Sequence, residues 1–350
     1  MTDAPCDTFR GTKDHTDAFL DWMRGKGKGL IIIHDYPDPD SLASAMALRH
    51  LLTMKLNRDS VIACSGMIRR SENSAMVREL EISLTPLEVV NVDDYSMVCM
   101  LDTQPGAGNN SLPPEVTVDL VIDHHPIHES SRKCRWVDIR EDYGASATIL
   151  YEYLVAQNVS IGTKLATALF YAIKSETQDL GREAGRADRN AYLRLFPLTN
   201  KKLLNEIAQP RLPQSHFRTM HRALMNTMIF ANLLVIKMGK IGTPEVVAEM
   251  ADYLMRLEGV DVVMSMGWYH GVLILSMRTT RHDLNAGELM IKLVAGQGTA
   301  GGHGMTAGGK IDPVSPSPAA LHRLEESLTQ QLLDELGIAH CTARALINDR

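Results

Sequence analysis

The chain has 350 residues, of which 45% are hydrophobic, and a formal net charge of −6 at pH 7. A chain of this length is large for a single hydrophobic core, so we expect two domains. The acidic balance argues against a protein that coats long nucleic acid, because such proteins carry a basic excess. It is compatible with a small anionic substrate held by a few local cations.

The cysteines and the hydropathy pattern indicate in which cellular compartment the protein is expected. The sequence has no apolar stretch of about 18 residues, the approximate minimum for a membrane-spanning helix, and no apolar segment at its start. Its five cysteines are scattered and form no Cys-x-x-Cys pair, which favours free thiols in a reducing environment. We therefore expect a cytoplasmic protein that does not bind membranes.

Short apolar runs alternate with helical patterns through the first half of the chain. Strands are expected at residues 30–33, 61–64, 97–101 and 118–122, and helices at residues 17–24, 41–56, 73–80, 144–157 and 163–175. The apolar runs are rich in β-branched residues, which is typical of buried strands in a parallel sheet. The alternation predicts an α/β fold with a doubly wound parallel sheet in the N-terminal domain.

The pattern changes near residue 198 and restarts after residue 228. The intervening segment is polar and basic, and we interpret it as a connector with some helix near residues 217–228. The predicted parts are a domain at residues 1–197, a connector at 198–228 and a smaller α/β domain at 229–350. In the last part we expect strands at 233–238, 260–268 and 272–277, helices at 244–257 and 285–294, and no regular element in the glycine-rich residues 296–309.

Three predicted strands of the first domain end on side chains that can bind metal. The strand at residues 30–33 is followed by His34, Asp38 and Asp40. The strand at 97–101 is followed by Asp102, and the strand at 118–122 by Asp123, His124 and His125. In open α/β sheets, ligands bind outside the carboxyl ends of the strands. Acid and imidazole groups at three such ends therefore predict one pocket that holds metal.

The same segments also have a purely structural interpretation. Pro37 and Pro39 stiffen the turn after the first strand. Within that turn, Asp40 or Ser41 could cap the following helix, and Asp38 could simply complete the turn. Asp102, after the strand at residues 97–101, would on its own be an ordinary turn residue. Two adjacent imidazoles directly after a buried strand are harder to explain by packing.

The donor types narrow the choice of metal. Carboxylates and imidazoles without thiolates select Mn²⁺, Mg²⁺, Fe²⁺ or Zn²⁺ rather than a cysteine-bound structural zinc. Two ions roughly 3.5–4 Å apart, bridged by one carboxylate, lower the pKa of a bound water and clamp a phosphoryl group. Asp102 suits the bridge because it lies between the other two sets in strand order. Asp179, at the end of a predicted helix, is a fourth candidate.

These motifs resemble those of a known superfamily. His34-x-x-x-Asp38-x-Asp40, Asp102, Asp123-His124-His125 and Asp179 resemble, in order and approximate spacing, the four motifs of the DHH phosphoesterases. Gly301-Gly302-His303 is similar to the Gly-Gly-His signature of the DHH-associated C-terminal domain. The resemblance extends from about residue 30 to residue 310.

The resemblance implies a site for two divalent metal ions, with Mn²⁺ expected and Mg²⁺ as the alternative. One ion would bind His34, Asp38 and Asp102, and the other would bind Asp40, Asp102, His124 and Asp179. Asp123 would support the ligand set. His125 would face the phosphate as a stabiliser or proton donor.

The second domain carries candidate substrate-binding residues. Arg278 closes a predicted strand and Arg281 follows it, and an arginine in such a place can present its fork to a phosphate. A surface arginine in a turn is the ordinary alternative. The glycine-rich loop could form a backbone nest for an anion, and it brings Gly301, Gly302 and His303. These residues would hold the nucleotide end of the substrate in a cleft between the domains.

The closest likeness within the superfamily is to the two-domain nano-RNases, which degrade very short oligonucleotides and dephosphorylate 3′-phosphoadenosine 5′-phosphate. It implies a phosphoric ester hydrolase with a short oligonucleotide or small nucleotide as substrate, and it leaves a homodimer open. A cyclic-dinucleotide phosphodiesterase is the first alternative. A nucleotide sensor without turnover is disfavoured by the complete ligand set, and pyrophosphate hydrolysis by the lack of an Arg-Lys-Lys cluster in the second domain.

Overall fold

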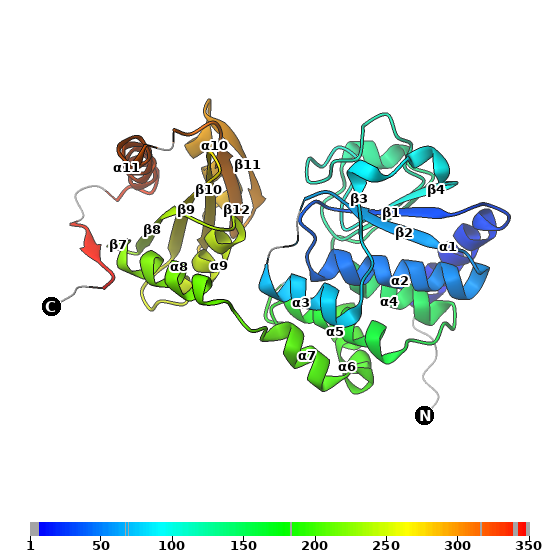
Figure 1. The fold of residues 1–350 in the computed structure, drawn as a ribbon. Coiled ribbons are helices and arrows are strands. Elements are labelled where there is room, and N and C mark those ends of the chain that lie inside the picture. Colours follow the sequence, from blue (N-terminus) through cyan, green and yellow to red (C-terminus); the bar gives the residue numbers. More distant parts are fainter. Residues whose placement is uncertain are drawn as a thin grey trace. The chain divides into compact units, whose positions relative to one another are not determined.

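The computed structural model describes residues 7–66, 68, 70–182, 184–315, 317–338 and 342–347, except for the side chains of residues 7–10 and His303. The chain forms two compact units, Met1–Arg211 and Leu212–Arg350 (Figure 1). The boundary between them lies inside the segment predicted as a connector. Among the described residues, no helix is long and apolar enough to cross a membrane.

The first unit contains a six-stranded parallel sheet in the order β3-β2-β1-β4-β5-β6. Its strands are β1 (Gly29–Ile33), β2 (Ser60–Cys64), β3 (Thr85–Pro86), β4 (Met97–Leu101), β5 (Leu120–Asp123) and β6 (Trp136–Ile139). The strand order reverses beside β1, where β2 lies on one side and β4 on the other. This is the switch point at which parallel sheets bind ligands, and the predicted parallel α/β architecture is confirmed.

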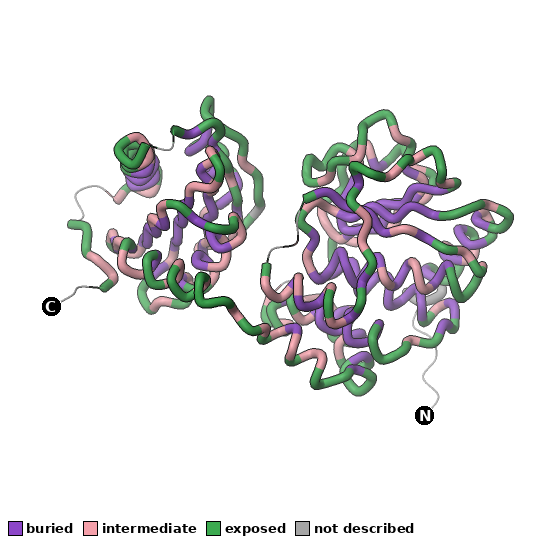
Figure 2. The backbone as a smooth tube through the Cα atoms, in the orientation of Figure 1, coloured by how far each residue is buried: buried purple, intermediate pink, exposed green. Residues whose placement is uncertain are grey.

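Long helices cover one face of this sheet (Figure 1). The helices of the unit are α1 (Asp7–Met23), α2 (Pro39–Leu56), α3 (Ser71–Leu80), α4 (Ser146–Ala156), α5 (Thr163–Glu176), α6 (Arg186–Leu195) and α7 (Lys201–Ala208). Alternate residues of β1, such as Ile31 and Ile33, are buried with α2, α4 and α5 in one core. Leu30 and Ile32 point to the other face and pack with the connecting segments there. Both faces are covered, which explains the unbroken apolar runs and the buried central strands in Figure 2.

The helix α2 begins in a way that differs from our expectation. The carboxylate Oδ1 of Asp38 accepts a hydrogen bond from the backbone N–H of Ser41 at 3.0 Å. Ser41 returns the contact, since its Oγ accepts from the N–H of Asp38 at 3.2 Å. Asp38 is therefore the N-cap, and Pro39 takes the first helical position. The cap is thus neither Asp40 nor Ser41, the two residues that we expected, and the side chain of Asp40 instead accepts hydrogen bonds from the start of α4.

The second unit contains a seven-stranded mixed sheet in the order β11-β12-β10-β9-β8-β7-β13. Its strands are β7 (Thr227–Phe230), β8 (Leu233–Lys240), β9 (Val262–Tyr269), β10 (Val272–Thr279), β11 (Gly298–His303), β12 (Thr306–Ile311) and β13 (Arg344–Ala345). Among the described strands of this second sheet, only β8 and β9 pair in parallel, and the other neighbours are antiparallel. The helices are α8 (Gln214–Met225), α9 (Glu245–Leu254), α10 (Ala286–Val294) and α11 (Pro318–Glu335), and the sheet separates two apolar cores.

The glycine-rich segment corrects our prediction that it has no regular structure. It forms the antiparallel hairpin of β11 and β12, paired from Gly298↔Ile311 to His303↔Thr306. A Cβ built on Gly298 would lie 2.0 Å from the carbonyl oxygen of Lys310, and one on Gly302 would lie 2.4 Å from that of Thr306. The glycines thus permit close approach of backbones, which outweighs their poor strand propensity.

Candidate metal centre

The predicted metal ligands of three strand ends lie together at the carboxyl edge of the first sheet. We name this set the strand-end cluster. It contains His34 after β1, Asp38 and Asp40 at the start of α2, Asp102 after β4, Asp123 at the end of β5, and His124 and His125 directly after it. Donor atoms of two subsets come within 4.8 Å of one another, and Asp102 belongs to both. The shared residue is the one whose strand lies between the other two.

The first subset joins His34, Asp38 and Asp102. The Nε2 atom of His34 lies 3.4 Å from Oδ1 of Asp38 and 3.6 Å from Oδ2 of Asp102. The other ring nitrogen of His34 lies 2.9 Å from the carbonyl oxygen of Asp35, which fixes the ring orientation. Such a backbone partner on the second nitrogen is the usual arrangement for histidines that bind metal.

The second subset joins Asp102, Asp123, His124 and His125. The Nε2 atom of His124 lies 3.6 Å from Oδ1 of Asp102 and 3.8 Å from Oδ2 of Asp40. This nitrogen is buried and has no hydrogen-bond partner, while Nδ1 lies 3.2 Å from the carbonyl oxygen of Tyr143. A buried polar atom without a partner is costly, and a metal ion is one way to satisfy it.

The supporting contacts differ between the two remaining aspartates. Both carboxylate oxygens of Asp40 accept backbone N–H groups at the start of α4, from Ser146 and Ala147, each at 2.7 Å. Asp123 accepts a hydrogen bond from the side-chain amide of Gln104 at 2.8 Å. Its Oδ1 lies 2.9 Å from Nδ1 of His125. Asp40 is thus held beside Asp102 and His124, whereas Asp123 chiefly orients its neighbour.

The pKa values show strong crowding of like charges. Burial, together with the carboxylate of Asp38, raises the pKa of Asp102 to about 7. Burial and the nearby Asp102 raise the pKa of Asp40 well above its usual range. Burial alone would lower the pKa of His34, but the charge and hydrogen bond of Asp38, the charge of Asp102 and the carbonyl group of Asp35 together outweigh it and raise the pKa to about 10. Divalent cations remove the repulsion between such carboxylates, so the oxygen and imidazole donors fit divalent metal ions.

The structure does not bring Asp179 to the strand-end cluster. Its side chain is 56% exposed and lies 2.8 Å from the ammonium group of Lys174. It also accepts a hydrogen bond from Tyr192, and these two contacts hold the pKa of Asp179 below its usual value. The chain turns away after α5, because Asp179 and both of its neighbours have left-handed backbone angles.

Glu176, the last residue of α5, is a carboxylate that we did not predict for this site. Burial and the charge of Asp38 raise the pKa of Glu176 to about 7, and His125 and His34 act on it in the opposite direction. Its carboxylate therefore lies within electrostatic reach of the strand-end cluster. The sequence signal that could have found it is an acidic residue at the end of a helix with a buried apolar stripe.

The predicted substrate-binding residues lie in the second unit. Arg278, in β10, donates from Nε to Oδ1 of Asp252 at 2.5 Å, and its side chain is 17% exposed. Arg281 pairs with Asp283 at 2.6 Å near the surface. Gly301 and Gly302 pair with β12 in the hairpin, while the side chain of His303 lies outside the described part of the structure. Both arginines thus already have carboxylate partners within their own unit.

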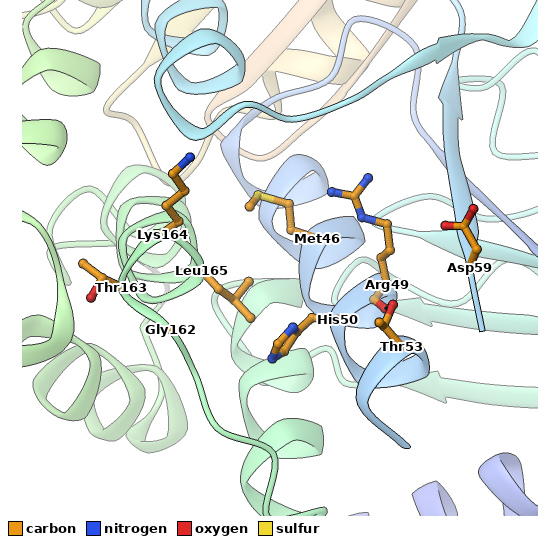
Figure 3. Close-up of a pocket in the computed structure, with 9 residues that line it drawn as sticks. All are labelled: Met46, Arg49, His50, Thr53, Asp59, Gly162, Thr163, Lys164 and Leu165. Atoms are coloured by element: carbon orange, nitrogen blue, oxygen red, sulfur yellow. Dashed lines mark hydrogen bonds between the residues drawn. The ribbon is translucent and has the colours of Figure 1, made fainter. Parts of the chain in front are cut away.

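A separate hollow of about 650 Å³ lies between α2 and the start of α5 (Figure 3). Its lining comprises Met46, Arg49, His50, Thr53, Asp59 and residues 162–165. The helix rises about 1.5 Å per residue, so Met46 and Thr53 lie roughly 9 to 20 Å along α2 from Asp40. Lys164, at its rim, already pairs with Glu81. The hollow is therefore distinct from the strand-end cluster.

Fold and donor set together define a two-unit α/β protein with a carboxylate–imidazole centre suited to divalent cations. Residues 28–173 match the DHH family, N-terminal domain, and residues 230–330 match the DHHA1 domain. The chain therefore belongs to the DHH phosphoesterase superfamily. The first match contains the motifs from His34 to His125 and lies in the first unit. The second match contains Gly301-Gly302-His303 and lies in the second unit.

A curated relative is an uncharacterized protein of Methanocaldococcus jannaschii, with 33% identity over 316 residues. The match covers 88% of this chain but 64% of that protein, so the chain spans less than two thirds of its relative. Among solved structures, it is similar to an exopolyphosphatase-related protein from Bacteroides fragilis, with a TM-score of 0.72 and 15% identity, covering 91% of this chain and 97% of that one.

A second solved structure with this fold is RecJ from Thermus thermophilus in complex with Mn²⁺. The TM-score is 0.53 at 15% identity, and the match covers 94% of this chain and 59% of that one. At such identities, the likeness to both solved structures concerns the fold.

Proposed function

We propose that this chain is a metal-dependent phosphoesterase that hydrolyses short oligonucleotides and small phosphorylated nucleotides such as 3′-phosphoadenosine 5′-phosphate. The observation that carries the proposal is the sharing of Asp102 between two donor sets that meet at one sheet edge. A shared carboxylate is what a pair of divalent ions needs for a bridge. The choice of nucleotide rests on the family resemblance of the motifs.

The chain's own residues divide into two donor sets. One would consist of His34, Asp38 and Asp102, and the other of Asp40, Asp102 and His124, with Glu176 in the place first assigned to Asp179. When bound, two divalent cations, Mn²⁺ or Mg²⁺, supply a nucleophile from water at neutral pH and neutralise the charge of a phosphoryl group. The strand ends hold these donors rigidly, which reduces the cost of reorganisation during reaction.

His125 is the candidate group for contact with the phosphate. Burial alone would lower its pKa, but the hydrogen bond with Asp123 and the charge of Asp102 raise the pKa to about 10. The imidazole side chain is 39% exposed, in contrast to His124 at 12%. With Nδ1 directed at Asp123, a proton on Nε2 is available to a phosphoryl or leaving-group oxygen.

The second unit would supply recognition of the substrate. Arg278 and Arg281 offer charged forks for a phosphate, and the hairpin with Gly301, Gly302 and His303 offers backbone N–H groups. Because Arg278 is paired with Asp252, a substrate phosphate would have to compete with that carboxylate. The chain's partners are proposed to be small nucleotides, neither long nucleic acid nor membranes.

A turnover panel tests the proposal with Mn²⁺ or Mg²⁺ in excess. The substrates are dinucleotides, 3′-phosphoadenosine 5′-phosphate, a long single strand, a cyclic dinucleotide, pyrophosphate and polyphosphate. We expect turnover of the first two and a steep fall with oligonucleotide length, since a chain of net charge −6 has few ways to hold long nucleic acid. Preference for the cyclic dinucleotide would favour the first alternative.

The panel includes Asp102→Ala as a reference. Loss of turnover in this variant would tie the measured activity to this chain and to its strand-end cluster. Binding of nucleotides without any turnover by the wild-type chain would identify a sensor and contradict the proposal. Hydrolysis of pyrophosphate or polyphosphate alone would contradict the nucleotide assignment.

A further inference from the structure

An aromatic side chain stands exposed within the turn that begins the strand-end cluster. Tyr36 lies between His34 and Asp38, and its side chain is 60% exposed. Its backbone has φ 56, in the left-handed region that non-glycine residues seldom adopt. Strain of this kind persists only where the surrounding structure enforces it, and it concentrates at functional sites.

The surrounding structure does enforce this conformation. The N–H of Tyr36 donates to the carbonyl oxygen of Ser65 at 3.3 Å. The carboxylate of its neighbour Asp35 accepts from the N–H of Ser65 at 3.2 Å and from Oγ of Ser111 at 2.6 Å. On the other side, the carbonyl oxygen of Pro37 accepts from the amide of Asn73 at 3.0 Å. Segments after β2 and β4 and the helix α3 thus fix the turn.

The ring of Tyr36 lies against a glycine. A Cβ built on Gly66 would lie 2.8 Å from Cε1 and 2.9 Å from Cδ1 of the ring. Any side chain at this position would push the ring away, so Gly66 allows the ring to rest on the backbone after β2. A single exposed aromatic residue is ordinary on a protein surface. A ring held by an anchored, strained turn and supported by glycine is not explained by packing alone.

The place of Tyr36 in the turn puts its backbone close to two of the donor residues. Tyr36 is two residues from His34 and two from Asp38, so its Cα lies within roughly 7 Å of the Cα of each. A nucleoside attached to a phosphate at the strand-end cluster extends over a similar distance. Exposed aromatic rings are the usual stacking platforms for unpaired bases, and stacking tolerates every base.

We propose that Tyr36 is a stacking platform for a nucleobase of the substrate, beside the phosphate that is cleaved. The assignment rests on the proposed phosphoesterase function and deepens it. It makes the first unit itself selective for nucleotides over inorganic phosphates. Tyr36 is a positioning residue and has no part in proton transfer.

Steady-state kinetics of the full chain with Mn²⁺ test this assignment. Two substrates are compared: a dinucleotide, and a matched dinucleotide in which tetrahydrofuran abasic sites replace both bases. We expect Tyr36→Ala to lower kcat/KM on the dinucleotide about 10- to 100-fold, mainly through KM, and on the abasic substrate by less than about threefold. Tyr36→Phe keeps the ring and should stay within about threefold on both substrates.

Two further variants separate stacking from a structural effect. Tyr36→Leu keeps bulk without an aromatic face and should behave like Tyr36→Ala. Phe217→Ala removes a ring of similar exposure in α8, 55% against 60%, and should change neither substrate. An equal loss on both substrates in Tyr36→Ala, or full activity in Tyr36→Leu, would overturn the stacking role. A wild-type chain that cleaves neither substrate would contradict the proposed function, and the stacking assignment would fall with it.

Discussion

Two groups of buried carboxylates lie near the same edge of the first sheet, and they are satisfied in different ways. In the first, Asp138 of β6 and Glu152 of α4 surround Arg140, and we name this group the arginine cluster. The guanidinium donates to both oxygens of Asp138 at 2.8 and 2.7 Å and to Glu152 at 2.6 Å. Each carboxylate there has a permanent positive partner from the chain itself.

The strand-end cluster has no such partner among its described ion pairs. The ion pairs of Asp102 and Asp40 are all with histidines, at 3.6 to 3.8 Å, which is long for a hydrogen bond. The pKa of Asp102 is raised to about 7 by burial and neighbouring carboxylates. Buried charge is tolerated only when it is paired or coordinates metal. The carboxylates of the arginine cluster are thus neutralised within the chain, whereas the donors of the strand-end cluster fit divalent metal ions from solution.

The largest effect is expected on activity, from Asp102→Ala. This variant removes the carboxylate shared by both donor sets, so kcat/KM should fall more than about 1,000-fold with Mn²⁺ in excess. The midpoint of thermal unfolding without added metal should not fall, because crowded like charges are relieved. Retention of more than a few per cent of turnover would exclude Asp102 as the bridge.

The opposite pattern is expected for Arg140→Ala. Loss of the guanidinium leaves buried Glu152 and half-buried Asp138 without a positive partner, which should lower the free energy of unfolding by about 3–5 kcal/mol. The folded fraction should keep its kcat. Denaturant titration measures the loss, and Arg132→Ala is the control, because its pair with Glu129 is exposed and should contribute less than about 1 kcal/mol. Equal stability of the two variants would remove the contrast between the clusters.

A third variant pair tests which carboxylate of the α5 end belongs to the strand-end cluster. Glu176→Ala should lower kcat/KM about 100-fold, with a raised Mn²⁺ requirement. Asp179→Ala should change it less than about threefold, since that side chain is exposed and paired with Lys174. Mn²⁺ titrations of activity separate the two. The reverse order would restore Asp179 as the ligand.

The smallest effect is expected in the second unit, where Arg278 already has a carboxylate partner. Arg278→Ala should reduce kcat/KM on nucleotides by about 1.5–3 kcal/mol, as expected for a charge-assisted contact. It should barely affect bis-p-nitrophenyl phosphate, which can reach the metals without that contact. Equal loss on both esters would place Arg278 at the reacting phosphate. No loss on either would leave it as the partner of Asp252 only.

The sequence could predict that these side chains meet because His34, Asp102 and Asp123 directly follow apolar runs, and parallel strands bring their ends to one edge. It could not show that three consecutive residues with left-handed backbone angles, Gln178 to Leu180, turn the chain just beyond the helix and leave Asp179 exposed and paired with Lys174. Periodicity does not reveal such a turn. Glu176, at the end of α5, lies within electrostatic reach of the cluster. The spacing of the sequence motifs does not distinguish between Glu176 and Asp179 as the carboxylate at this point.

The hairpin of β11 and β12 was missed for a different reason. Glycine is a poor strand former, and the sequence alone does not show that backbones approach closely there. A Cβ on Gly287 of α10 would lie 2.1 Å from the carbonyl oxygen of Gly302. The tight packing between α10 and the hairpin is a tertiary property, and it overrides local propensity.

Thermal unfolding with added Mn²⁺ tests, without reference to any substrate, whether divalent cations complete the strand-end cluster. Ligands that bind only the folded state raise its stability by RT ln(1 + [L]/Kd), about 2.7 kcal/mol at a hundredfold excess over Kd. If they do, Tm should rise with the Mn²⁺ concentration for the wild type and for Arg132→Ala, and much less for Asp102→Ala. No rise in the wild type, or the same rise in Asp102→Ala, would contradict that role of the cations.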